Sequence, residues 1–185
     1  MSKLFYVIGA SGAGKDTLMN YVRTHINGSE RVIFAHRYIT RPPFTGNENH
    51  VHLSTEEFLL RMNAGLFAFN WESHHQHYGI GLEINMWMEN GFNVVVNGSR
   101  QYLPVAQKLH PSMKVILIDA KSEIIADRLA SRGRESAADI EKRMARTAEI
   151  DTDLENCIRI ENNGAIEDAG NQLLNIISTT QKIYI

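Results

Sequence analysis

The chain has 185 residues, of which 43% are hydrophobic and 22% charged, and its formal net charge is −2. These values are typical of one globular domain with a sizeable core and exclude a disordered or fibrous chain. The small charge gives no reason to expect nucleic-acid or membrane binding, so an anionic ligand must meet locally clustered arginines.

The chain begins with a strand–turn–helix pattern. Leu4–Ile8 is an apolar run that is too short for a signal peptide or a membrane span, and we expect it to be a buried strand. Lys15–His25 can form a helix, and the glycine-rich segment GASGAGKD (Gly9–Asp16) joins the two. Val32–Phe34 is the next strand candidate.

The middle of the chain has fewer buried runs, and we expect residues 36–90 to form an inserted lobe. A capping box at Ser54–Glu57 predicts the start of a helix there. The elements expected in this part are that helix, which ends near Gly65, a hairpin of Leu66–Glu72 and Gln76–Tyr78, and a helix over Leu82–Asn90.

Strands and helices alternate in the rest of the chain, which predicts a mainly parallel α/β sheet with right-handed crossovers. The expected strands are Asn93–Asn97, Lys114–Asp119 and Ile158–Ile160, and the expected helices are Gln101–Leu109, Ser122–Ser131 and Ile166–Thr180. Cys157 is the only cysteine, so no disulfide can form within the chain, and we expect a cytoplasmic protein. The sequence assigns no oligomeric state.

GASGAGKD matches the phosphate-binding pattern G-x-x-x-x-G-K, which is followed by Ser or Thr in its usual form. The glycines allow backbone N–H groups to converge on phosphate oxygens, and Lys15 can reach the outer phosphates. The alternative, a glycine-rich turn without a ligand, is disfavoured by the preceding strand and the lysine. The expected ATP-binding residues are Gly9, Ala10, Ser11, Gly12, Ala13, Gly14, Lys15, Asp16 and Thr17.

Asp16 stands where this pattern has a magnesium-binding hydroxyl. Mg²⁺ prefers hard oxygen ligands, so we expect Asp16 to hold the ion, directly or through water. The alternative is a carboxylate that only stabilises the first turn of a helix. Thr17 offers a hydroxyl one residue later, but about 100° further round the helix.

Two clusters of arginines suggest anion binding. In HRYITR, Arg37 and Arg41 could converge on an anionic acceptor, because guanidinium groups bind phosphate oxygens through two N–H donors. In the second cluster, Arg132 and Arg143 could close over ATP and offset the charge on the transferred phosphoryl group. The alternatives are solvated loop arginines in the first cluster and an exposed helix pair with scattered ion pairs in the second.

A third group, His74, His75 and His77, is a weak candidate for a zinc site, because no cysteine lies nearby. We expect these histidines at a hairpin tip or on the surface of the inserted lobe. Trp71 and Trp87 are expected to pack inside that lobe.

The order of these parts resembles the guanylate kinase group of nucleoside-monophosphate-kinase-like folds. The motifs that carry the resemblance extend along almost the whole chain: GASGAGKD, TRPP, HYGIG, RLASRGRESAADIEKRMARTAE and ENNG. The resemblance implies one P-loop kinase domain over residues 1–185, with an acceptor-binding lobe at about 36–90 and an arginine-rich helical lid at about 128–146. It also implies that Asn162 lies near the adenine of ATP.

The acceptor site departs from that of guanylate kinases. Their guanine-reading glutamate falls on Phe69, and a hydroxyl residue that contacts the base falls on Ile80. A segment DID becomes Asn97-Gly98-Ser99, and Arg37 replaces a small serine. A pocket that has lost its base-reading groups rejects guanine, because each hydrogen bond left unmade is costly.

The combination of GKD, HRYITR, GNENH, YGIGLEI and VNGSR resembles the ribose 1,5-bisphosphate phosphokinases of phosphonate breakdown. This resemblance implies Mg²⁺-assisted transfer from ATP to the 1-phosphate of ribose 1,5-bisphosphate, which gives 5-phospho-α-D-ribose 1-diphosphate (PRPP) and ADP. The alternatives are a nucleoside-monophosphate kinase of the guanylate type and a non-catalytic interaction module. The expected substrate-binding residues are Arg37, Arg41, Tyr78, Asn97 and Arg100.

Overall fold

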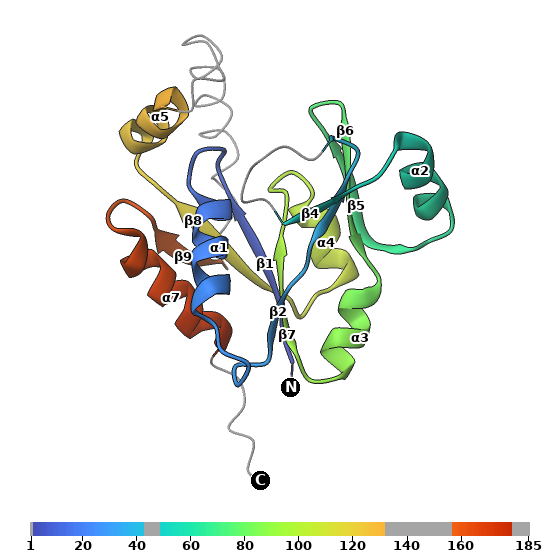
Figure 1. The fold of residues 1–185 in the computed structure, drawn as a ribbon, viewed down its shortest axis with the longest axis horizontal. Coiled ribbons are helices and arrows are strands. Elements are labelled where there is room, and N and C mark those ends of the chain that lie inside the picture. The colour runs from blue at the N-terminus through green and yellow to red at the C-terminus, as the bar shows by residue number, and fades with distance from the viewer. Residues whose placement is uncertain (1, 43–48, 132–156, 179–185) are drawn as a thin grey trace.

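The computed structural model describes residues 2–42, 49–131 and 157–178. Five parallel strands form a central sheet, so the predicted parallel α/β architecture is confirmed (Figure 1). In sheet order these strands are β2 (Val32–Phe34), β7 (Asn93–Asn97), β1 (Leu4–Gly9), β8 (Lys114–Asp119) and β9 (Ile158–Glu161).

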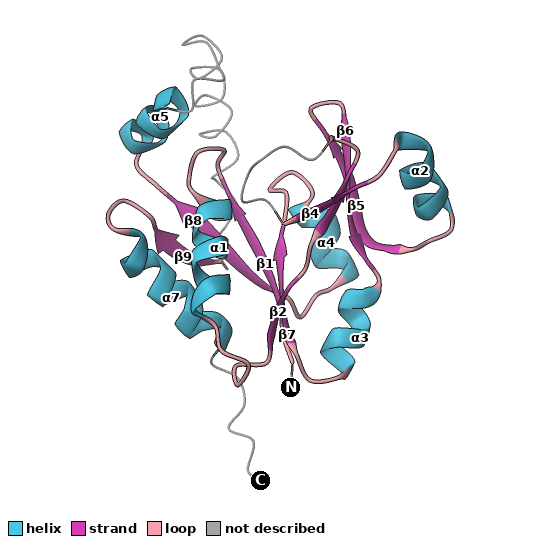
Figure 2. Ribbon diagram, in the orientation of Figure 1, coloured by secondary structure: helices cyan, strands magenta, loops and turns pink. Residues whose placement is uncertain are grey.

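Helices cover both faces of this sheet (Figure 2). On one face lie α1 (Lys15–His25), α5 (Ser122–Ser131) and α7 (Ile166–Ser178), and on the other lie α3 (Glu83–Glu89) and α4 (Leu103–Leu109). A strand at the centre of such a sheet is buried on both sides, which explains the continuous apolar run of β1. Phe5 and Val7 pack toward α1, whereas Tyr6 and Ile8 pack toward the opposite face.

A second, four-stranded sheet lies beside the central one, at the upper right of Figure 1. In sheet order its strands are β4 (His50–His52), β3 (Arg37–Ile39), β6 (Gln76–Gly81) and β5 (Phe67–Ser73), and α2 (Thr55–Asn63) packs against β5. The Ser54 hydroxyl accepts a hydrogen bond from the Glu57 N–H at 3.1 Å, which confirms the predicted helix cap.

Most elements lie where the sequence predicts them, although some boundaries differ by one to three residues. Strands β3 and β4 are not predicted by the sequence, because RYI and HVH contain no apolar run. Helix α4 begins at Leu103 rather than at the predicted Gln101, and Pro104 occupies its first turn, where no N–H is needed. The predicted end of the last helix, Thr180, lies outside the described residues. No described helix has the length and apolar character to cross a membrane.

Candidate active site

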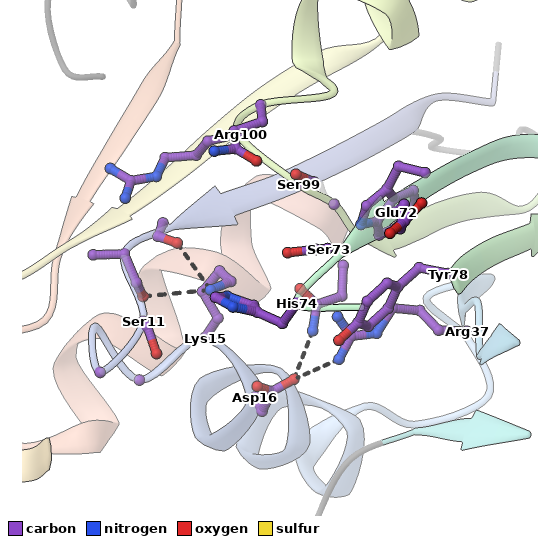
Figure 3. A pocket seen from close by; sticks show the side chains of 18 of the residues that line it. Ser11, Lys15, Asp16, Arg37, Glu72, Ser73, His74, Tyr78, Ser99 and Arg100 are labelled. Atoms are coloured by element: carbon purple, nitrogen blue, oxygen red, sulfur yellow. Dashed lines mark hydrogen bonds and ion pairs between the residues drawn. The ribbon is translucent and has the colours of Figure 1, made fainter. Parts of the chain in front are cut away.

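A cavity of about 600 Å³ lies at the carboxyl ends of β1 and β7, where ligands bind in open α/β sheets. The phosphate-binding loop forms one side of the cavity, and the β5–β6 hairpin forms another. The residues that line it include Lys15, Asp16, Arg37, Trp71, His74, His75, Tyr78, Asn97, Ser99 and Arg100. Figure 3 shows several of them turned toward a common space.

The phosphate-binding loop joins β1 to α1, as the sequence predicts. Gly14 caps α1 in the left-handed region at φ 91°, and a Cβ at this position would lie 2.4 Å from Nδ2 of Asn162. Only glycine therefore fits here without strain. The Lys15 ammonium donates hydrogen bonds to the carbonyl oxygens of Gly9 at 2.9 Å and Ala10 at 3.4 Å, so it lies against the loop (Figure 3).

Asp16 is the point at which the loop meets the acceptor-side residues. Its Oδ1 accepts a hydrogen bond from Nδ2 of Asn97 at 2.6 Å and lies 3.5 Å from a guanidinium nitrogen of Arg37 (Figure 3). Both residues line the cavity, and half of the Asp16 side-chain surface is exposed, whereas Arg37 is 11% exposed. The sequence predicts Asp16 as an ATP- and Mg²⁺-binding residue but does not predict these two partners.

Four of the five predicted substrate-binding residues line this one cavity: Arg37, Tyr78, Asn97 and Arg100. Arg41 does not line it, so the structure does not bring Arg41 together with the other four. Arg41 follows β3, where its carbonyl oxygen lies 3.1 Å from Nδ1 of His52. Its predicted contact with substrate stays a prediction.

Aromatic rings form the wall of the cavity beside Arg37. The Arg37 guanidinium lies 5.8 Å from the centre of the Tyr78 ring, and Trp71 stacks on Tyr78 with centroids 5.5 Å apart and planes within 4°. Trp71 also stacks on Tyr102. Trp71 is predicted only to pack the lobe, but it also lines the cavity. The signal in the sequence is its position three residues before His74, at the hairpin tip.

The three histidines of the hairpin separate into two environments. His74 and His75 form the turn, with φ of 51° and 58°, and both line the cavity. His77 instead stacks on Phe58, with centroids 5.3 Å apart. The expected hairpin-tip placement is thus confirmed for His74 and His75.

The two positions that read guanine in the resemblance are buried here. Phe69 and Ile80 are both 0% exposed and belong to the apolar cluster beneath the cavity. Phe69 packs edge-on against Tyr6, with centroids 5.6 Å apart. Neither residue lines the cavity. These side chains therefore present no hydrogen-bonding group to a base.

Tyr6 holds the segment that carries Asn97 and Arg100. Its hydroxyl donates to the Ser99 carbonyl at 3.2 Å and accepts from the Ser99 N–H at 3.0 Å. Burial raises the pKa of Tyr6 well above its ordinary value, so the phenol stays neutral and can fill both roles. A Cβ on Gly98 would lie 2.2 Å from the Tyr6 ring, so glycine is required for this close approach.

A smaller cavity of about 220 Å³ lies on the other side of the loop, lined by Gly14, Thr17, Arg128 and Asn162 among others. The Ala13 carbonyl accepts from Nδ2 of Asn162 at 2.8 Å and from Arg128 at 3.3 Å. Arg128 also donates to the Asn162 carbonyl at 3.0 Å. These contacts hold the phosphate-binding loop on the side of the smaller cavity. The predicted lid residues Arg132 and Arg143 lie outside the described residues.

Comparisons with known proteins agree on one family. The sequence model of the guanylate kinase family matches residues 1–180. The chain is 47% identical to ribose 1,5-bisphosphate phosphokinase PhnN of Desulfomicrobium baculatum over 180 residues, which cover 97% of this chain and 96% of that protein. It is 48% identical to the protein of the same name from Psychromonas ingrahamii over 176 residues, which cover 95% of this chain and 89% of that protein.

The fold is also found among solved structures. Guanylate kinase from Anaplasma phagocytophilum superposes with a TM-score of 0.70 at 16% sequence identity, and the match covers 99% of this chain and 88% of that one. This likeness supports the architecture of a P-loop kinase.

Proposed function

Because the chain belongs to the guanylate kinase family and, within it, to the ribose 1,5-bisphosphate phosphokinases, we propose that it phosphorylates ribose 1,5-bisphosphate with ATP. The acceptor is the 1-phosphate, and the products are PRPP and ADP. The partners of the protein are these small molecules, its location is the cytoplasm, and its product belongs to phosphonate breakdown.

The observation that carries this proposal is the chemistry of the 600 Å³ cavity. Arg37 and Arg100 line it together with Lys15, so two cations besides the one proposed for ATP can meet an acceptor with two phosphate groups. The guanine-reading positions hold the buried side chains of Phe69 and Ile80. A cavity with several cations and no base-reading side chain at these positions favours a phosphorylated sugar over a nucleotide acceptor.

The reaction requires positioning more than proton transfer. The attacking atom is a phosphate oxygen that is already ionised near neutral pH, so no strong general base is needed. The difficulty is to hold two groups of anions in line, and Lys15, Arg37 and Arg100 offset their repulsion. In this assignment Lys15 moves from the carbonyls of Gly9 and Ala10 to the outer phosphates of ATP.

The nucleotide would lie over the phosphate-binding loop, with its adenine toward the smaller cavity beside Asn162. The Asn162 amide already holds the Ala13 carbonyl, so it both shapes the loop and borders the space for the base. Arg132 and Arg143, which lie outside the described residues, complete the proposed site as lid residues that contact the transferred phosphoryl group.

The residues present fit a Mg²⁺ ion. The described residues contain no group of three His, Cys, Asp or Glu side chains that could hold a metal. Kinases hold Mg²⁺ through one or two carboxylates together with ATP phosphates and water, so Asp16 alone suffices. Its contacts with Asn97 and Arg37 both fall on Oδ1. When bound, the ion neutralises charge on the phosphates.

Asp16→Asn should raise the Mg²⁺ concentration needed for half-maximal activity by roughly tenfold, the scale on which altered metal-site residues lower affinity. The amide keeps the shape of the side chain but removes the negative charge that attracts the cation. Activity is titrated with Mg²⁺ at fixed ATP and acceptor. An unchanged titration would show that Asp16 does not hold the ion.

The site of transfer is tested by the phosphorus NMR spectrum of the product. Transfer to the 1-phosphate creates a diphosphate, with two coupled signals, and leaves the signal of the 5-phosphate as a monophosphate. A product in which the 5-phosphate has become the diphosphate would contradict the proposed acceptor.

A further inference from the structure

Three residues from distant parts of the chain meet at one oxygen atom. Asp16 lies in the first turn of α1, Arg37 begins β3 in the second sheet, and Asn97 ends β7. Both Arg37 and Asn97 contact Oδ1 of Asp16, at 3.5 Å and 2.6 Å. The carboxylate therefore links the phosphate-binding loop to the side of the cavity proposed for the acceptor (Figure 3).

Arg37 needs such a link because its charge is largely removed from water. Its side chain is 11% exposed, and a buried guanidinium requires an opposite charge nearby. The face of Tyr78 at 5.8 Å adds an attraction but does not fix where the guanidinium nitrogens point. Asp16 supplies a negative charge for Arg37 and also orients its guanidinium group. A guanidinium has five N–H donors, so a guanidinium that contacts a carboxylate can also bind a phosphate group.

Asn97 is held in the same way. It is 5% exposed, and its amide group donates to Asp16 through Nδ2. This hydrogen bond to a charged acceptor fixes the orientation of the amide. Because Asp16 directly follows Lys15 in α1, the positions of Arg37 and Asn97 are set relative to the residue proposed to bind the outer phosphates of ATP.

We propose that Asp16 is a positioning residue for the acceptor: it orients Arg37 and Asn97 so that they hold the acceptor phosphate at the correct place relative to Lys15 and the ATP phosphates. This role is separate from magnesium binding and rests on the proposed function. The positioning role and simple charge repulsion predict opposite effects of Asp16 removal on acceptor binding. Removal of a carboxylate from an anion-binding cavity should by itself tighten anion binding, whereas loss of positioning weakens it.

The experiment measures binding of ribose 1,5-bisphosphate by calorimetry in EDTA, without nucleotide, so that metal binding cannot contribute. The variants are Asp16→Ser, which restores the hydroxyl typical of the loop but is shorter than aspartate, and Asp16→Asn. We expect Asp16→Ser to weaken binding by about tenfold, because an oriented charge-assisted contact is lost, and Asp16→Asn to weaken it less. Thermal melting of each variant checks that the fold is intact.

Two controls separate positioning from a general effect. Asp168→Asn removes an exposed first-turn carboxylate from α7 that does not line the 600 Å³ cavity, and it should leave binding unchanged. In a double-mutant cycle, Asp16→Ser should weaken binding of the bisphosphate much less in an Arg37→Ala background than in the wild type, because Asp16 acts in large part through Arg37.

The outcomes are distinguishable. Unchanged or tighter binding by Asp16→Ser, while the wild type binds and phosphorylates the bisphosphate, overturns the positioning role alone. Full additivity with Arg37→Ala also overturns it, because Asp16 then acts independently of Arg37. A wild-type protein that neither binds nor phosphorylates the bisphosphate overturns the proposed function, and the positioning role with it.

Discussion

Replacement of Lys15 by alanine is expected to lower kcat by about 10³-fold or more, because charge stabilisation is the main catalytic requirement of phosphoryl transfer. Lys15 is the one cation that the loop pattern places at the outer phosphates of ATP. In the structure its ammonium bonds to the carbonyls of Gly9 and Ala10, and these oxygens can bond to water after truncation because the site is open to the cavity. The fold should therefore persist.

Steady-state kinetics and a thermal melt test this prediction together. Lys121→Ala is the matched control, because Lys121 is an exposed lysine away from the cavity and should keep full activity. If Lys15→Ala retained the wild-type kcat with a normal melting temperature, the phosphate role of Lys15 would be wrong.

Gly98→Ala is expected to destabilise the protein by about 1–3 kcal/mol. It should also raise the KM for ribose 1,5-bisphosphate more than the KM for ATP. The new methyl group would lie 2.2 Å from the ring of Tyr6, which is fully buried and cannot move away. Strain at this point displaces the segment that carries Asn97 and Arg100. A shift of this kind can lower activity by about 10²-fold through loss of alignment.

Gly28→Ala provides the steric control, since no atom lies within 4 Å of the position of its added Cβ. It should leave both stability and kinetics unchanged. The informative comparison is the KM for ribose 1,5-bisphosphate against the KM for ATP in Gly98→Ala. A normal melting temperature together with normal KM values for both substrates would show that the Tyr6–Gly98 contact does not position the acceptor site.

The sequence predicted those parts of the fold that depend on local pattern. Continuous apolar runs identified β1, β7 and β8, and Ser54 identified the start of α2. Strands β3 and β4 were missed because they are short and polar, and because the pairing of β3 with β4 and with β6 joins residues that are distant in sequence.

The candidate site was predicted to a similar extent. The loop pattern located Lys15 and Asp16, the arginine pattern HRYITR located Arg37, and the resemblance added Asn97. The contact of Asp16 with both could not be predicted, because it joins residues 21 and 81 positions apart through tertiary packing. Arg41 was grouped with Arg37 because they are neighbours in sequence, but the two do not line the same cavity.

A comparison of acceptors tests the central claim most directly. ADP release is measured with ATP and Mg²⁺ on ribose 1,5-bisphosphate, GMP and the other nucleoside monophosphates. The proposed function predicts a kcat/KM for the bisphosphate that exceeds that for GMP by at least about 10²-fold, because the cavity has cations for a second phosphate and lacks the base-reading side chains. Rapid turnover of GMP with none of ribose 1,5-bisphosphate would contradict it.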